Sequence, residues 1–97
     1  MMRISIRGFL TLRKVMDAQT AFDFDGDRLT VDDLLHELYA RYGEDFRKMI
    51  FDPETHALSR DIRILVNGRH YSHLPGKLNT QLHEGDEVSL FPPIAGG

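Results

Sequence analysis

Apolar and polar residues alternate with a period of two in several short stretches of this chain. Residues 1–9 place Ile4 and Ile6 on one side, with arginines and a serine on the other. Residues 21–25 alternate in the same way and bring two phenylalanines to one face. Alternation of this kind predicts strands that are buried on one side only. The same pattern predicts further strands at residues 62–66, 69–71 and 87–91.

The period changes to that of a helix between residues 31 and 42. Thr30 is the expected N-cap, with Asp33 as its partner at the third helical position, and Gly43 is the expected end. Another helical turn is expected at residues 44–51. A single apolar stripe predicts that the main helix is amphipathic. The residues of this stripe are Val31, Leu34, Leu35, Leu38 and Tyr42.

The remaining segments are predicted to be connections. Residues 10–16 have a mixed character and follow Gly8, where a bulge or a close backbone approach is expected. Residues 52–61 are polar and contain a proline, which predicts an irregular loop. The pair Asn67-Gly68 predicts a type I′ hairpin turn.

The resulting order of two strands, a helix and three strands predicts an α+β fold. We expect a mixed sheet of about five strands, covered on one face by one main helix, with the other face open to water or to a partner. The folded domain is expected at residues 1–91, and a flexible tail at residues 92–97.

Two apolar residues are predicted to lie on the open face. If the helix covers Val88 and Leu90, Phe91 faces the other way, and the alternation of the third strand leaves Leu65 on that side too. Both residues would lie beside Pro92 and could form a docking patch. The alternative is that they are isolated exposed apolar residues, which are ordinary on protein surfaces.

Composition narrows the possible functions. A length of 97 residues accommodates one domain. The chain has no cysteine, which excludes disulfides, thiolate metal sites and a cysteine nucleophile. A net charge of −3 and a pI of about 5.9 do not indicate the basic surface that nucleic-acid binding proteins carry. No apolar run is long enough to span a membrane and no signal-peptide core is visible, so a cytoplasmic location is expected.

Polar motifs give little indication of catalysis. His70 and His73 have a spacing that could serve a metal, but no cysteine or obvious third ligand accompanies them, so no metal site is expected. The acidic residues between Asp23 and Glu37 could attract a basic partner, and a solvated face is the preferred interpretation. No Ser/His/Asp order or phosphate loop stands out, so the chain is not expected to be an enzyme on its own.

The last seven residues form the most distinctive stretch of the chain. Two prolines stiffen the exit from the last strand, and two glycines leave the end without side chains. Fully extended, the stretch from Pro92 onward could reach about 20 Å, enough to enter a cleft in another protein. A frayed terminus is the ordinary alternative. The stretch reads Phe91-Pro92-Pro93-Ile94-Ala95-Gly96-Gly97.

Three segments carry a resemblance to a known family. They are similar to the ubiquitin-like sulfur carriers of the MoaD/ThiS family, and most of all to the small subunit of molybdopterin synthase. In that subunit a Gly-Asp-Glu-Val strand ends in Phe-Pro-Pro and a terminal Gly-Gly. The resemblance implies a ubiquitin-like β-grasp fold. The segments are Val66-Asn67-Gly68, Leu82-His83-Glu84-Gly85-Asp86-Glu87-Val88 and the last seven residues.

The resemblance also implies a chemistry for the tail. A terminal carboxylate has a pKa of about 3.5 and is a poor electrophile, so the carboxylate of Gly97 must be activated. In the sulfur carriers, a separate adenylating enzyme of the MoeB/ThiF type joins this carboxylate to AMP from ATP. A persulfide on a sulfur donor protein then displaces AMP and leaves a thiocarboxylate. The carrier itself binds no cofactor.

The resemblance further implies the partners of the tail. The sulfur would pass to a pterin precursor of the molybdenum or tungsten cofactor, in a complex with a molybdopterin synthase large subunit of the MoaE type. Gly97 would be the reacting residue and a cosubstrate of its partners. The residues expected to contact the partners are Gly96, Ala95, Ile94, Pro93, Pro92, Phe91 and Leu65.

Three other functions remain open. One is a ubiquitin-like protein modifier that is joined through Gly97 to lysines. After proteolysis it would be detected as Gly-Gly remnants on those lysines, whereas a sulfur carrier would show a thiocarboxylate mass. Another is a sulfur carrier for a different pathway, such as thiamine synthesis or tRNA thiolation. The third is a plain binding module with an unmodified tail, in which removal of Gly96 and Gly97 changes nothing.

Overall fold

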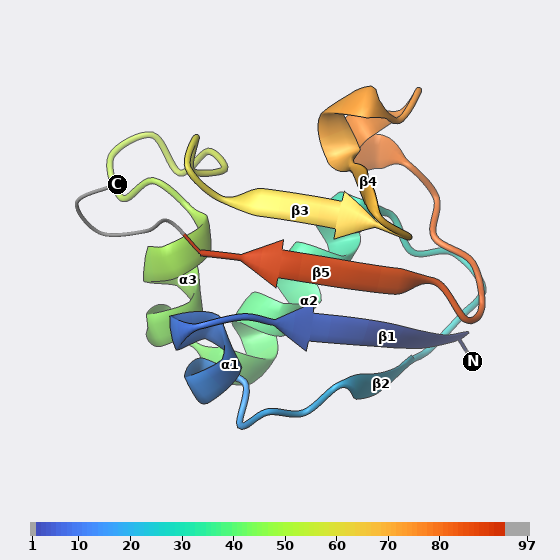
Figure 1. Cartoon of the computed structure of the whole chain (residues 1–97), viewed down its shortest axis with the longest axis horizontal. Coiled ribbons are helices and arrows are strands. Elements are labelled where there is room, and N and C mark those ends of the chain that lie inside the picture. The colour runs from blue at the N-terminus through green and yellow to red at the C-terminus, as the bar shows by residue number, and fades with distance from the viewer. Residues whose placement is uncertain (1, 93–97) are drawn as a thin grey trace.

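A five-stranded mixed sheet forms the centre of the molecule, with helices packed on one side of it (Figure 1). The computed structural model describes residues 2–92. The strands follow the order β2-β1-β5-β3-β4 across the sheet, which confirms the predicted α+β class and the mixed sheet. Their bounds are Met2–Gly8 for β1, Ala21–Phe24 for β2, Arg63–Val66 for β3, Arg69–His70 for β4 and Glu87–Phe91 for β5.

Strand β5 lies in the centre of the sheet, although it comes last among the described strands. It pairs in parallel with β1, where Ile6 lies beside Val88, and antiparallel with β3, where Ile64 lies beside Leu90. These four side chains are fully buried. The outer strands β2 and β4 pair antiparallel with β1 and β3. The centre of the core therefore joins the beginning and the end of the fold.

The main helix, α2 (Val31–Tyr42), covers the inner face of the sheet. Thr30 and Asp33 form a capping box, in which each side chain accepts a hydrogen bond from the backbone N–H of the other at 3.0 Å. Gly43 follows the last helical residue as the C-cap, and its φ of +76° favours glycine. The predicted cap and end are thus confirmed. The fully buried side chains of the stripe are Val31, Leu34, Leu35 and Leu38.

A short helix, α1 (Thr11–Val15), occupies part of the stretch that we expected to be a connecting segment of mixed character, and we did not predict this helix. Leu12 and Met16 are four residues apart and fully buried, and they anchor α1 against the end of β1. Gly8 permits this contact, because a Cβ at that position would lie 2.8 Å from Met16 Sδ and 3.2 Å from Leu12 backbone atoms. The close backbone approach expected at Gly8 is confirmed.

Two further local predictions are confirmed. The helical turn expected after the main helix is α3 (Glu44–Ile50), which buries Phe46 and Ile50. Asn67 and Gly68 have φ values of +51° and +84°, and a type I′ turn requires positive φ at both positions.

Strand β4 is shorter than predicted. It ends at His70, and Tyr71, which we expected in the strand, begins the 3₁₀-helix η1 (Tyr71–His73). The change of direction follows from His70, because its Nδ1 accepts a hydrogen bond from the Ser72 N–H at 3.2 Å. A second 3₁₀-helix, η2 (Lys77–Asn79), lies in the crossover that leads to β5.

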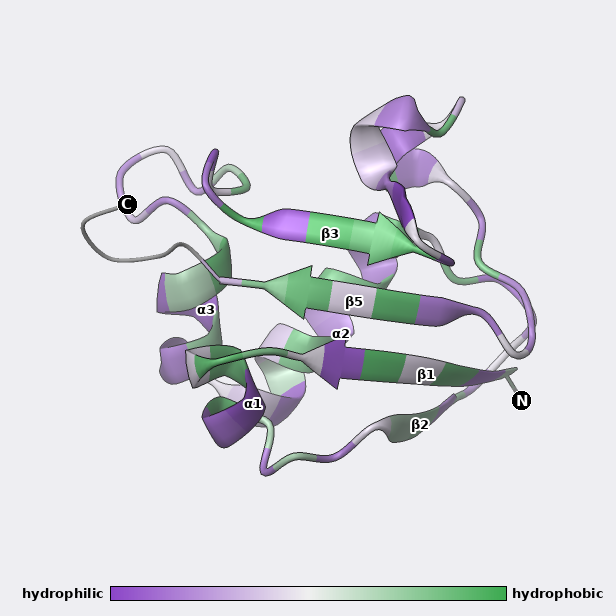
Figure 2. Cartoon of the chain, in the orientation of Figure 1, coloured by the Kyte–Doolittle hydropathy of each residue, from purple (hydrophilic) through white to green (hydrophobic). Residues whose placement is uncertain are grey.

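The two faces of the sheet differ in polarity. Hydrophobic residues alternate with more hydrophilic ones along β1 and β5 (Figure 2), and the buried residues join the core beneath α2. No polar or charged residue in the described part of the chain is buried. The open face is turned toward the viewer in Figure 1, with the helices behind it. No helix within residues 2–92 has the length and apolar character needed to cross a membrane.

Candidate functional site

The candidate site lies where β5 leaves the sheet. Phe91 is the last residue of the strand. Pro92, which we expected in the flexible tail, is buried. The described residues therefore show the base of the tail and its surroundings. The other predicted tail residues lie outside the described part of the chain, namely Pro93, Ile94, Ala95, Gly96 and Gly97.

Phe91 and Leu65 share the open face of the sheet. In the ladder between β3 and β5, Leu65 pairs with Ser89 and Arg63 pairs with Phe91. Paired residues point to the same side, and so do residues two apart on one strand, so these four side chains form one surface. Both apolar side chains are half-buried. The two residues that we expected to contact a partner are therefore diagonal neighbours across the ladder.

Phe9 is a third member of this apolar surface, and we did not predict it. Its ring stacks on that of Phe91, with centroids 4.3 Å apart and planes inclined by 7°. The Phe9 N–H donates to the Leu90 carbonyl at 3.0 Å, which continues the pairing of β1 with β5 by one residue. A signal exists in the sequence, because Phe9 follows Ser5 and Arg7 at the outward positions of the first strand. That pattern predicts that Phe9 lies on the open face of the sheet, but it does not predict that β5 is the strand beside it.

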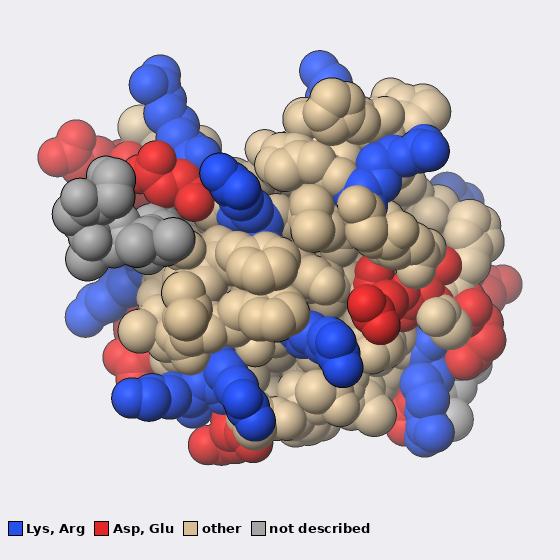
Figure 3. Space-filling view, in the orientation of Figure 1, with Lys and Arg blue, Asp and Glu red and all other residues tan. Residues whose placement is uncertain are grey.

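Arginines border this apolar surface. Arg63 lies beside Phe91 on β3, and Arg7 lies beside Ser89 on β1, and both arginines are exposed. Figure 3 looks onto this face and shows uncharged residues in the middle, with Lys and Arg side chains around them and Asp and Glu side chains toward the right and the upper left. Neither arginine forms an ion pair with a carboxylate of residues 2–92. Their charges suit a partner surface that carries carboxylates.

The shifted pKa values described next belong to groups that lie away from the end of β5. The Arg3 side chain hydrogen-bonds to Asp23, with Nε 2.8 Å from Oδ1, and lowers the pKa of Asp23. The Thr30 N–H lowers the pKa of Asp33, and burial raises the pKa of Tyr42. These groups belong to a strand pair, a helix cap and the core. The described residues at the end of β5 thus form a contact surface rather than an acid–base pair.

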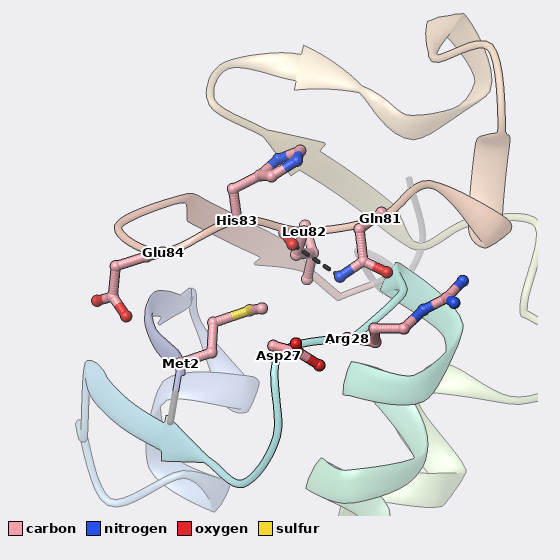
Figure 4. Close-up of a pocket in the computed structure, with 7 residues that line it drawn as sticks. All are labelled: Met2, Asp27, Arg28, Gln81, Leu82, His83 and Glu84. Atoms are coloured by element: carbon pink, nitrogen blue, oxygen red, sulfur yellow. Dashed lines mark hydrogen bonds between the residues drawn. The ribbon is translucent and has the colours of Figure 1, made fainter.

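A surface hollow of about 500 Å³ lies at the opposite end of the sheet (Figure 4). Met2 begins β1 and Glu84 precedes β5, and because these strands are parallel the hollow opens at their starting ends. The Gln81 side chain donates to the Leu82 carbonyl at 2.9 Å. The hollow is therefore separate from the base of the tail. Its lining residues are Met2, Asp27, Arg28, Gln81, Leu82, His83 and Glu84.

The His70 and His73 rings belong to the turn that follows β4. They meet edge to face, with centroids 6.2 Å apart, and His70 Nδ1 lies 2.8 Å from Ser72 Oγ. Within residues 2–92, no group of three His, Cys, Asp or Glu side chains is placed to hold a metal ion.

Comparison with known proteins decides the family. The chain matches the model of the ThiS family over residues 9–97. The chain belongs to the ThiS family. The match begins at Phe9, in the apolar surface at the base of the tail, and includes the Gly-Gly end.

Two relatives of this ThiS-family chain have names that bear on function. The small archaeal modifier protein 3 of Haloferax volcanii is 38% identical over 96 residues, which are 99% of this chain and 100% of the relative. A putative sulfur carrier protein of Archaeoglobus fulgidus is 38% identical over 79 residues, which are 81% of this chain and 86% of the relative.

Solved structures confirm the predicted ubiquitin-like β-grasp fold. Small archaeal modifier protein 1 of Haloferax volcanii has a TM-score of 0.77 and 30% identity, over 98% of this chain and 99% of that chain. A putative molybdopterin converting factor subunit 1 from Pyrococcus furiosus has a TM-score of 0.71 and 24% identity, over 97% of this chain and 100% of that chain, and this likeness shows the fold alone. The ThiS-family chain is thus one of the small ubiquitin-like sulfur carriers and modifiers, which are not catalysts themselves.

Proposed function

We propose that this protein is a carrier whose Gly97 carboxylate is activated by a separate ATP-dependent adenylating enzyme. The observation that carries the proposal is the ThiS-family match, which extends through Gly97. At the base of the tail, the described residues supply apolar and basic contacts. An ionised carboxylate is a poor electrophile, so its activation has to come from a partner.

The proposed chemistry has an activation step and a sulfur-transfer step. A Gly97 carboxylate oxygen attacks the α-phosphate of ATP, which forms an acyl-adenylate and releases pyrophosphate. The terminal sulfur of a persulfide on a donor protein attacks the acyl carbon, and AMP leaves. A thiol then reduces the acyl disulfide and frees the thiocarboxylate. Glycine at the last two positions suits a narrow channel, and a partner that encloses the adenylate protects it from water.

The sulfur acceptor that we propose is a pterin precursor, bound in a complex with a molybdopterin synthase large subunit. The support is the tail sequence, in which Phe91-Pro92-Pro93 leads to Gly96-Gly97 as in the small subunit of that synthase. Thiamine synthesis and tRNA thiolation would start from the same thiocarboxylate. Purified thiocarboxylate protein, offered in parallel to each acceptor system, should lose its sulfur only to the correct one.

A protein-modifier function is the second candidate. The observation that favours it is the 38% identity to a small archaeal modifier protein over nearly the whole of both chains. A lysine amine would attack the carbonyl carbon of the same Gly97 acyl-adenylate, displace AMP, lose a proton and form an isopeptide bond. Both candidates depend on activation at Gly97 and differ in the nucleophile that follows.

An intact-mass measurement tests the proposed function. The protein is incubated with ATP, a sulfur donor and an adenylating enzyme that is demonstrably active on a reference carrier. The exchange of one oxygen for sulfur should raise the mass by about 16 Da. Deletion of Gly97 should abolish the gain and leave the circular dichroism spectrum unchanged, because the last strand ends at Phe91 and a terminal residue seldom contributes to a fold. Absence of both the adenylate and the mass gain in the wild type would overturn the proposal.

Peptide mapping of conjugates separates the modifier from the carrier. No Lys or Arg follows Lys77, so trypsin leaves residues 78–97 on a modified lysine rather than a short Gly-Gly remnant. Branched peptides of that kind, dependent on ATP and lost on deletion of Gly97, would establish conjugation. A thiocarboxylate without such branches would assign the protein to sulfur transfer alone.

A further inference from the structure

Leu10 is the one large apolar side chain that is strongly exposed within residues 2–92, with an exposed fraction of 63%. It directly follows Phe9, whose ring stacks on Phe91, so it lies at the base of the tail. One exposed leucine is ordinary by itself. Two further observations indicate a role for Leu10, namely its backbone conformation and the charge of the surface beside it.

The backbone of Leu10 adopts a conformation that favours glycine. Its φ of 56° and ψ of −124° are those of the first central position of a type II′ turn. The Leu12 N–H closes this turn by donating to the Phe9 carbonyl at 3.1 Å. Leu10 also precedes α1, where it makes no side-chain cap. Leucine is thus unfavourable here for two reasons, because it disfavours a positive φ and because it cannot cap the helix. Residues that are unfavourable for the local structure often occur at functional positions.

The surface next to this leucine carries positive charge. A hollow of about 310 Å³ is lined by both Arg7 and Arg13, together with Phe9. Arg63 lies beside Phe91 on the other side of the stack. Figure 3 shows basic side chains gathered over α1. The ion pairs within residues 2–92 involve none of these three arginines.

We propose that Leu10, with Arg7 and Arg13, forms the contact by which the adenylating enzyme holds this protein. The enzyme presents an apolar socket to Leu10 and carboxylates at its rim to the two arginines. This inference rests on the proposed function, because only an activated carrier requires such an enzyme. A contact at the base of the tail directs the residues after Phe91 toward the enzyme-bound nucleotide, so binding energy gained there positions the distant carboxylate.

A second copy of this chain fits the same surface less well. In a two-fold contact the same patch meets itself, so the arginines of one copy face those of the other. Like charges placed opposite each other across an interface oppose association. A partner with an acidic rim is the complement of this surface.

The first test replaces Leu10 with glycine or methionine in the full chain. Glycine adopts a φ of 56° without strain, so Leu10→Gly should keep or raise the melting temperature while it removes the apolar contact. In ATP–pyrophosphate exchange, we expect the KM for the carrier to rise about tenfold or more and kcat to change less than about twofold. Leu10→Met keeps an apolar side chain and should remain close to the wild type.

The second test replaces Arg7 and Arg13 with glutamine. We expect a higher KM for the carrier and a weaker dependence of that KM on salt, because the removed charges attract the enzyme at long range. The KM for ATP should not change. Arg69→Gln removes an exposed arginine of β4 and is the matched control. A rise in the KM for ATP would instead assign the hollow to nucleotide phosphate and overturn the inference.

The outcomes separate this inference from the proposed function. A wild-type chain that is never adenylated overturns the proposed function. Normal adenylation of the wild type, with an unchanged KM in Leu10→Gly, overturns the docking contact alone. A dimer of the free chain in sedimentation velocity, abolished by Leu10→Gly while KM stays the same, would assign the surface to self-association and also overturn the inference.

Discussion

The stack of Phe9 on Phe91 should be measurable as a coupling between the two residues in protein stability. Both rings are half-buried, with centroids 4.3 Å apart and planes inclined by 7°. For a gap of about 3.5 Å between the planes, this separation implies a lateral offset of about 2.5 Å. Offset stacking is an arrangement that aromatic pairs favour. We therefore expect each ring to lose a favourable contact when the other is removed.

A double-mutant cycle isolates this contact. Phe9→Leu, Phe91→Leu and the combined variant keep an apolar side chain at both positions. An aromatic pair contributes about 0.5–1.5 kcal/mol beyond its buried area, so the two single losses in free energy of unfolding should together exceed the loss in the double variant by that amount. In a domain of this size, about 1 kcal/mol corresponds to about 4–8 °C in Tm. The backbone bond from Phe9 to Leu90 is common to all variants and cancels.

Urea unfolding followed by far-ultraviolet circular dichroism is a suitable assay, since the chain has no tryptophan. The matched control is the cycle of Phe9→Leu with Phe24→Leu, because Phe24 is buried on the other face of the sheet in β2. In this control cycle, the two single losses in free energy of unfolding should add up to the loss in the double variant within about 0.5 kcal/mol. A coupling between Phe9 and Phe91 that is no larger than this control would refute the stacking argument.

Two other predictions concern the helix cap and acidic pH. Thr30→Ala should lower the free energy of unfolding in urea by about 1 kcal/mol, whereas Thr30→Ser should keep most of it. The Thr30 N–H lowers the pKa of Asp33, and the N–H groups of Glu54 and Thr55 lower that of Asp52. A lowered carboxyl pKa stabilises the fold above the unfolded pKa of about 4, and this contribution disappears as the pH falls below it. The free energy of unfolding should decline below about pH 4. An equally steep decline in Asp33→Asn would show that the lowered pKa of Asp33 does not contribute to it.

The alternation of residues predicted which way side chains face, but not which strands are neighbours. It placed Leu65 and Phe91 on the open face, where the structure has them. The pairing of β1 with β5 joins segments from opposite ends of the domain, and no local pattern specifies it. Phe9 was missed for this reason. Its partner ring becomes a neighbour only when the parallel pair forms.

Helix α2 was predictable because several local signals agree. An apolar stripe, a capping box at Thr30 and a closing glycine at Gly43 all define the same segment. Helix α1 lacks such agreement, since it has only five residues and starts after Leu10, which provides no cap. Its position depends on packing against Gly8, a contact that appears only in the folded chain.

The candidate site likewise combines residues that the sequence could indicate with residues that only the folded chain brings together. The tail residues up to Gly97 could be proposed as the reacting end from their order in the sequence, because stiff prolines and bare glycines act through local chain properties. The arginines at the base of the tail could not, because Arg7, Arg13 and Arg63 come from three separate segments. The burial of Pro92 likewise depends on the packed domain and not on the proline itself.

The central place of β5 has a consequence for the order in which this protein is made and used. β5 is the last described strand to leave the ribosome, and until it does β1 has no parallel partner and β3 lacks its longest ladder. Pairing between distant segments is slow, and unpaired strand edges favour aggregation. The strand that completes the sheet also leads into the tail. If an activating enzyme recognises the base of the tail, as we propose, only a chain with a finished sheet can be activated.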